Sequence, residues 1–188
     1  IMYAGGKQET EYTVPQGVTT VALPGFREAS HLIKINFTGT VETIQGGALL
    51  SDSLESIVLG PSVESCESGV GLMMHNFREV IVDKENPVYC SVDGVLYSKD
   101  MSTIYWYPYA KSGETYTVPE SVHVVDDAFS ENQNLREIVF EGRITLTSSG
   151  AFTRLGSGIP GGARIVFEGG VDPDGFHQDA FFYATPAL

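Results

Sequence analysis

The feature that most limits how this chain can fold is a short apolar motif that returns at nearly constant spacing. The motif, written NLREIVFEG in its clearest copy, stands at residues 31–39, 53–60, 76–83 and 134–142, and a degenerate copy ends at Gly169. Leu32 and Leu54 are 22 residues apart, and Leu54 and Phe77 are 23 apart. A period of roughly 20–29 residues is typical of leucine-rich repeats.

Three positions of the motif, L-x-x-I-x-F, alternate with polar ones, which predicts a strand with one buried face. The first position holds Leu32, Leu54, Phe77, Leu135 and, weakly, Gly162. The second holds Ile35, Ile57, Val80, Ile138 and Ile165. The third holds Phe37, Leu59, Val82, Phe140 and Phe167. One unit cannot bury these residues alone, so we expect consecutive units to stack around a continuous core.

The other half of each unit predicts a second, shorter strand. It begins at Val18, Val41, Val63, Val122 and Ile144. A small residue followed by a large one comes later in the unit, at Gly25-Phe26, Ala48-Leu49, Ala128-Phe129, Ala151-Phe152 and Ala180-Phe181. We expect the large residue to anchor a short helix or turn. The third unit is looser here, with GVGLMM at residues 69–74.

An insertion interrupts the repeats between Phe77 and Leu135, which are 58 residues apart. Asp93-Gly94, flanked by apolar runs, is a strong hairpin signal because glycine accepts a positive φ. A further strand is expected from Thr103 to Tyr107, closed by Pro108. The insertion is therefore predicted to be a small antiparallel sheet that stands off the solenoid.

The repeat pattern, with its VP-x-S/G-V lead-in at residues 14–18 and 118–122, resembles the BspA-like leucine-rich-repeat family of microbial surface proteins. The N-P-x-Y and D-G-V-L-Y-S-K-D segments within residues 86–119 are similar to an insertion module of that family. The resemblance implies a β-rich α/β fold: a right-handed solenoid with short helices or turns. We expect repeats at approximately 12–39, 40–60, 61–83, 117–142, 143–169 and, in part, 170–188, with the inserted β-hairpin module at 84–116.

Both ends of the sequence fall inside a repeating unit, since residues 1–18 match the end of the insertion and Ala180-Phe181 starts another repeat. We therefore expect a segment of a longer array, with any export signal outside it. The formal net charge is −13, from 11 Lys and Arg against 24 Asp and Glu. Such an acidic surface repels phosphate backbones and anionic lipids, which disfavours nucleic acid as a partner. No segment has the roughly 20 apolar residues of a membrane span.

Residues between the buried positions are expected to point outward from the main sheet in three rows. The middle row holds Asn36, Val58, Ile81, Val139 and Val166. One flanking row holds Lys34, Ser56, Glu79, Glu137 and Arg164, and the other holds Thr38, Gly60, Asp83, Glu141 and Glu168. An apolar stripe beside an acidic edge suits a protein partner with a basic rim. Alternatively, the β-branched residues only reflect strand preference.

A second candidate surface is the aromatic run from Tyr105 through Trp106 and Tyr107. Tyrosine and tryptophan dominate interface hot spots, and exposed aromatic rings also stack on sugars. Alternation would place Tyr105 and Tyr107 on one face of the strand and Ile104 and Trp106 on the other. Packing within the insertion is the competing interpretation.

The sequence offers little for catalysis or metal binding, so neither a catalytic residue, a metal ligand nor a cofactor is expected. Asp172-Pro173-Asp174-Gly175 resembles a turn more than a calcium loop, because no glutamate stands at the twelfth position. The four histidines are scattered and the two cysteines are unpaired in spacing. Cys66 falls on the position of Val21, Ile44 and Val125, which predicts a buried thiol.

The leading hypothesis is a non-enzymatic recognition module of a cell-surface or secreted protein. The family resemblance implies adhesion to a protein on a host or neighbouring cell. Glycan binding through the insertion aromatics and a passive spacer role are the alternatives.

Overall fold

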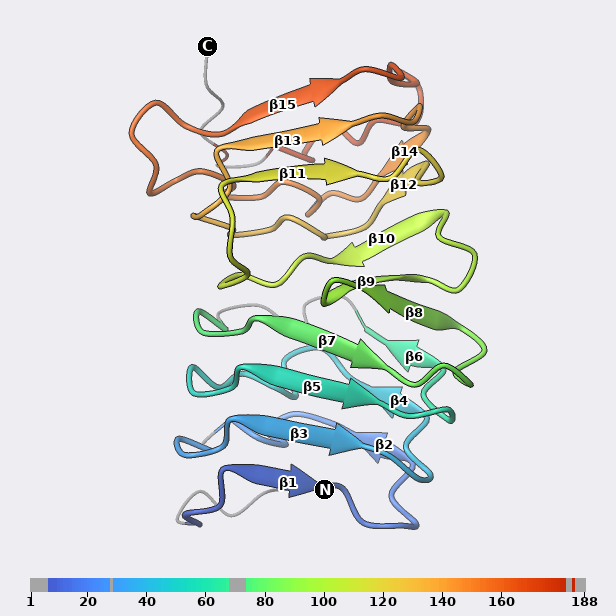
Figure 1. Ribbon diagram of the computed structural model, residues 1–188, viewed down its shortest axis with the longest axis vertical. Helices are drawn as coiled ribbons and strands as arrows, with labels where there is room; N and C mark the ends of the chain where they lie inside the picture. The colour runs from blue at the N-terminus through green and yellow to red at the C-terminus, as the bar shows by residue number, and fades with distance from the viewer. Residues whose placement is uncertain (1–6, 28, 68–73, 182–183, 185–188) are drawn as a thin grey trace. The chain divides into compact units, whose positions relative to one another are not determined.

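A computed structural model describes residues 7–27, 29–67, 74–181 and 184, and in these residues the chain consists of strands and turns (Figure 1). The strands are β1 Glu11–Thr13, β2 Thr20–Val21, β3 Lys34–Phe37, β4 Thr43–Ile44, β5 Ser56–Leu59, β6 Ser65–Cys66, β7 Glu79–Val82, β8 Tyr89–Val92, β9 Val95–Ser98, β10 Thr103–Trp106, β11 Thr115–Val118, β12 Val124–Val125, β13 Glu137–Phe140, β14 Leu146–Thr147 and β15 Arg164–Phe167. The chain divides into unit 1, residues 1–99, and unit 2, residues 100–188.

Of the short helices or turns that were expected, the turns are present, and the residues that the structure describes contain no helix. The segments between the two halves of each unit are runs of turns instead. At Phe26, for example, the amide donates to the carbonyl oxygen of Ala48 in the next repeat, at 2.9 Å. Phe129 bonds to Ala151 in the same way, at 3.0 Å. Backbone donors in these segments are thus satisfied partly between repeats and partly within single turns, such as Arg27 to Pro24, so no local helix is needed to satisfy them.

In unit 1 the repeated motif forms a four-stranded parallel sheet in the order β1-β3-β5-β7, which we call front sheet 1. The register aligns Tyr12 with Ile35, Ile35 with Ile57 and Ile57 with Val80. Ile35, Ile57 and Val80 are fully or almost fully buried. The predicted inward positions are therefore confirmed here, because strand alternation puts every second side chain on the core side.

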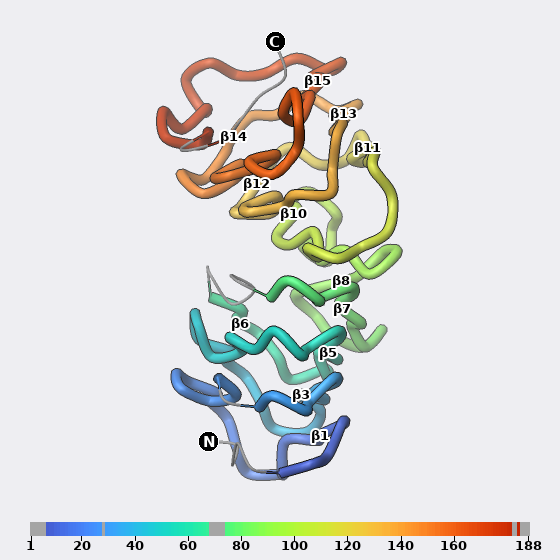
Figure 2. Tube along the Cα trace, turned by 90° about the vertical axis from the view of Figure 1, so that its left-hand side faces the viewer, coloured from blue at the N-terminus to red at the C-terminus, as the bar shows by residue number. Residues whose placement is uncertain are grey.

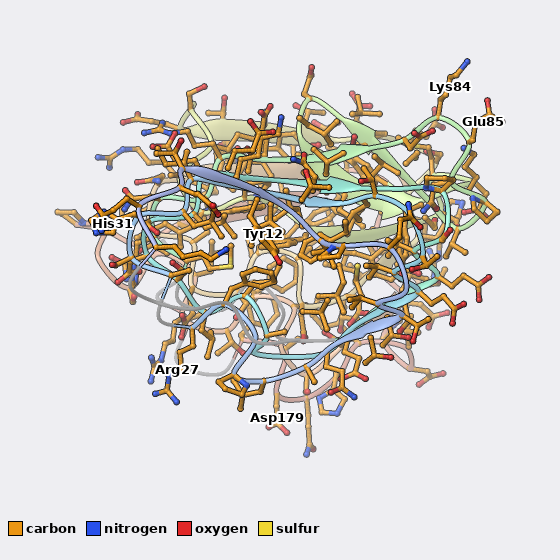
Figure 3. The ribbon with its side chains drawn as sticks, turned by 90° about the horizontal axis from the view of Figure 1, so that it is seen from below. Tyr12, Arg27, His31, Lys84, Glu85 and Asp179 are labelled. Carbon is orange, nitrogen blue, oxygen red and sulfur yellow. The ribbon has the colours of Figure 1, made fainter. Side chains whose placement is uncertain are left out.

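The shorter strands of unit 1 form the opposite layer, a parallel sheet in the order β2-β4-β6. Val21 aligns with Ile44 and Ile44 with Cys66, as the spacing predicted. Figure 2 shows the two layers from the side, with β3 and β5 in the front layer and β6 in the back layer. At the β1 end, Tyr12 points into the space between the layers (Figure 3) and its ring lies 5.9 Å from that of Phe26.

Unit 2 repeats this arrangement with its own pair of sheets. Front sheet 2 has the order β11-β13-β15, with Tyr116 aligned with Ile138 and Ile138 with Ile165. Its back layer contains β10, β12 and β14 in parallel. Between the layers, the ring of Phe152 stacks on those of Phe129 at 5.8 Å and Phe181 at 5.0 Å. Phe129 and Phe152 are fully buried and fill the core of unit 2 from one repeat to the next, whereas Phe181 is 38% exposed.

The insertion follows the prediction in part. Its first part is the expected hairpin, since β8 and β9 pair antiparallel around Asp93-Gly94. Both turn residues have positive φ, 50° and 77°, as a type I′ turn requires. The third predicted strand, β10, also pairs in parallel with β12, which aligns Ile104 with Val125. Residues 103–118 therefore supply one back strand and one front strand of the solenoid.

The hairpin does not stand off the solenoid but lies on the outer edge of β7. The Val80 amide donates to the Gly94 carbonyl oxygen at 2.8 Å, and the Val82 amide donates to Ser91 Oγ at 3.1 Å. Val80 and Val82 are alternate residues of β7, and their amides point to the edge that the hairpin covers. The Asp83 amide points to the other edge and donates to the Leu59 carbonyl oxygen of β5 at 2.8 Å. The hairpin thus accepts hydrogen bonds from β7 amides that would otherwise be free to pair with another strand. This protects the edge of the sheet.

Candidate binding surface

The outward side chains of front sheet 1 lie in two rows that follow the strand register. One row aligns Glu11, Lys34, Ser56 and Glu79, and the other aligns Thr13, Asn36, Val58 and Ile81. Ile81 is 39% exposed, Val58 is half-buried and Ser56 is buried. The exposed apolar part of this surface therefore lies at β7.

At the β1 end the same surface is a polar network. Asn36 Nδ2 donates to Glu11 Oε1 at 2.9 Å and to Thr13 Oγ1 at 3.2 Å. Lys34 Nζ lies 3.4 Å from Glu11 Oε1. The hydrogen bond from Asn36, followed by the interactions with Lys34, lowers the pKa of the Glu11 carboxyl. The charge of Glu11 is therefore compensated within the protein.

Front sheet 2 carries the corresponding rows of unit 2. Thr115, Glu137 and Arg164 align in one row, and Thr117, Val139 and Val166 align in the other. Val139 and Val166 are half-buried, and Arg164 forms an ion pair with Glu137. Glu141, directly after β13, is exposed. The predicted positions are thus outward in both units, although each unit presents its own surface.

The aromatic run around β10 is arranged differently from the predicted two faces. Ile104 and Tyr107 are the buried members, whereas Tyr105 and Trp106 are half-buried. Tyr107 is 3% exposed, and its ring lies 4.7 Å from that of Tyr116 and 5.7 Å from that of Phe129. Burial, with a smaller contribution from Tyr116, raises the pKa of Tyr107 to about 12. Tyr107 therefore belongs to the core.

The prediction based on alternation failed because Tyr107 lies beyond the end of β10. Its amide donates to the Ala128 carbonyl oxygen at 2.9 Å, as the Phe129 amide donates to Ala151 one repeat later. Tyr107 thus takes the position of the large anchoring residue, which is phenylalanine or, at Leu49, leucine in other repeats. Tyr105 remains at the surface, and burial followed by the charges of Asp126 and Asp100 raises its pKa.

The remaining candidates for chemistry have structural roles. Cys66 is half-buried, and burial raises the pKa of its thiol to about 12, as expected of a core position rather than a nucleophile. The Asp174 amide donates to Asp172 Oδ1 at 3.2 Å, which is a local turn. Among the described residues, no three His, Cys, Asp or Glu side chains are placed to hold a metal ion.

Sequence reasoning missed an exposed apolar residue on the back layer of unit 2. Leu146 is 51% exposed at the outward position of β14, next to buried Thr147. Strand alternation alone would place Leu146 on the same face as buried Ile144. The register with β12 shows the outward position instead, because it aligns Thr147 with buried Val125 and Leu146 with Val124. In the part of the chain that the structure covers, no helix has the length and apolar character of a membrane span.

A model of the BspA type leucine rich repeat region matches residues 4–85 and 89–157, in six copies. This chain belongs to the BspA-type leucine-rich repeat family. The matched regions include the strands of front sheet 1 and both strands of the hairpin. A search of curated protein sequences gave no match.

Two crystal structures show the fold of this BspA-type chain. The pneumococcal vaccine antigen PcpA is 23% identical, with a TM-score of 0.65, over 95% of this chain and 39% of PcpA. A leucine rich cell surface protein from Faecalibacterium prausnitzii is 17% identical, with a TM-score of 0.60, over 94% of this chain and 57% of that protein. The chain therefore spans about two fifths and just over half of these two proteins.

Proposed function

We propose that this chain is a non-enzymatic recognition module of a cell-surface or secreted protein. It binds a protein partner on a host or neighbouring cell through the outward faces of its front sheets. Two proteins of similar fold are a vaccine antigen and a cell surface protein, and the proposal extends that setting to this chain.

The observation that carries the proposal is the row of outward β-branched residues in strict register. Val58 aligns with Ile81 in unit 1, and Val139 aligns with Val166 in unit 2. Each position is held by a parallel backbone ladder, so the side chains are fixed before a partner arrives. Preorganisation of this kind reduces the entropy lost on binding.

The test compares three baits in pull-downs from host or microbial-community extracts. One is the unaltered chain, and the second carries Val58→Asp, Ile81→Asp and Val139→Asp on the front sheets. The third is a matched control with Thr20→Asp, Thr43→Asp and Leu146→Asp, at outward positions of β2, β4 and β14. Partners retained by the control and lost by the front variant support the proposal. An identical set with all three folded baits rejects it.

Glycan binding is the alternative that a specific observation favours. Tyr105 and Trp106 keep part of their surface exposed on consecutive positions of β10, although Tyr107 does not. Trp106 is the single tryptophan of the sequence, so its fluorescence reports this surface directly. A saturable response to a glycan, reduced by Tyr105→Ala, would favour this function. No change in Trp106 fluorescence across a broad glycan panel would exclude glycan binding at this surface. If neither extracts nor glycans give binding, the passive spacer role remains.

A further inference from the structure

The outward face of β7 combines an exposed apolar residue with acidic residues on both sides. Glu79 and Ile81 are alternate residues of the strand, and Asp83 follows two residues later. All three are exposed, whereas Val80, which points the other way, is 1% exposed. We call Glu79, Ile81 and Asp83 the β7 strip.

Within the described part of the chain, the acidic residues of the β7 strip form no ion pair, unlike Glu11 and Glu137 on other front strands. Glu11 is paired with Lys34, and Glu137 is paired with Arg164. Among the ion pairs of the described residues, none involves Glu79 or Asp83. The neighbouring cations pair elsewhere, Arg78 with Glu55 at 3.4 Å and Lys84 with Glu85 at 3.7 Å. Asp83 Oδ1 accepts a hydrogen bond from the Glu85 amide at 2.9 Å, which leaves its negative charge uncompensated.

The hairpin adds to this arrangement by fixing the edge of β7. Gly94 lies so close to the strand that a Cβ placed on it would come within 2.7 Å of Glu79 Cβ. The exposed Asp93 precedes it in the same turn. The strip is therefore held between β5 on one side and an acidic turn on the other.

We infer that the β7 strip binds a protein segment in which lysine or arginine residues flank an apolar residue. This inference rests on the proposed function and names the chemistry of the partner in unit 1. Alternate residues of a strand are roughly 6.6 Å apart. An extended segment of the pattern cation-x-apolar-x-cation therefore matches Glu79, Ile81 and Asp83 in both spacing and charge. Complementary charges of this kind contribute mainly specificity and association rate.

The test measures binding of a short fluorescent peptide of repeated Lys-Thr-Val-Thr to the full chain by polarisation. Replacing lysine with glutamate in the peptide is expected to abolish binding. Glu79→Lys with Asp83→Lys is expected to weaken binding by about tenfold or more, and Ile81→Thr by about threefold. The matched control is Glu42→Lys with Glu64→Lys, which changes the net charge equally at exposed residues just before β4 and β6.

Equal weakening by the β7 and control variants would show attraction to net charge alone and would overturn the inference. Binding of the glutamate peptide as tightly as the lysine peptide would do the same. Thermal unfolding of each variant establishes that it is folded. A further result would separate the two proposals. Suppose that binding of the extract partners depends on Val58 and Ile81, but that the β7 charge reversal changes the binding of none of them. Recognition by the front sheet would then stand, and the inference of a cationic partner would be rejected.

Discussion

Asn86 Nδ2 donates a hydrogen bond to the carbonyl oxygen of Gly60 at 2.7 Å, which joins the start of the insertion to the repeat before it. The same nitrogen donates to Val63 at 2.9 Å, and Asn86 Oδ1 accepts from the amides of Val88 and Tyr89. Asn86 is fully buried. The N-P-x-Y segment is therefore a hydrogen-bonded joint between the repeats and the hairpin.

Replacing Asn86 with alanine is expected to lower the free energy of unfolding by about 2–4 kcal/mol, because buried carbonyl and amide groups lose their partners. Asn76→Ala is the control, since Asn76 is exposed and donates a single hydrogen bond, to Asp52. Its cost should stay below about 1 kcal/mol. Urea unfolding measures both. Equal losses would mean that the buried joint adds nothing beyond one ordinary hydrogen bond.

Gly94→Ala is expected to destabilise the protein more than Gly17→Ala. Both glycines have positive φ, 77° and 89°. A Cβ at Gly94 would come within 2.7 Å of Glu79 Cβ, whereas one at Gly17 would meet nothing within 4 Å. Gly17→Ala should cost about 1 kcal/mol from the backbone alone, and Gly94→Ala about 1–3 kcal/mol more, because the hairpin must move off β7. Thermal unfolding of the two variants tests the difference, and similar values would argue against close docking of the hairpin.

Phe152→Ala is expected to lower the free energy of unfolding by about 3–5 kcal/mol. The side chain is fully buried and stacks on Phe129 and Phe181. Leu146→Ala, at a residue that is 51% exposed, should cost much less. Near-ultraviolet circular dichroism should change only for the phenylalanine variant. A small cost at Phe152 would contradict a tightly stacked core in unit 2.

Asp126→Asn is expected to stabilise the fold at neutral pH. Burial, with a smaller contribution from Asp127, raises the pKa of Asp126 above its ordinary 3.8. A carboxyl group with a raised pKa favours the folded state below its unfolded pKa, and this contribution is lost as the pH rises through the folded pKa. Because the group is only about half buried, the gain at pH 7 should stay under about 1 kcal/mol.

The gain from Asp126→Asn should disappear as the pH falls to the ordinary carboxyl range. Asp174→Asn, at an exposed turn, is the control and should change stability little at either pH. Unfolding free energies at neutral and acidic pH measure the effect. A gain that persists unchanged in acid would contradict an electrostatic origin.

Much of the fold could be predicted because the repeats impose one environment on equivalent residues. Ile35, Ile57 and Val80 align in one sheet and Ile138 and Ile165 in another, as the repeated spacing indicated. The outward positions followed from the same alternation. A single isolated strand would not have supported that inference, since its register is fixed only by its neighbours.

The sequence by itself determined which residues repeat and therefore which ones face the core. Only the tertiary structure decided where the segments that do not repeat are placed and which of their side chains are buried. The hairpin lies on β7 because the amides of Val80 and Val82 bond to it. Tyr107 is buried because its ring packs against those of Tyr116 and Phe129. Such contacts join residues distant in the sequence, so no local pattern of apolar and polar residues encodes them.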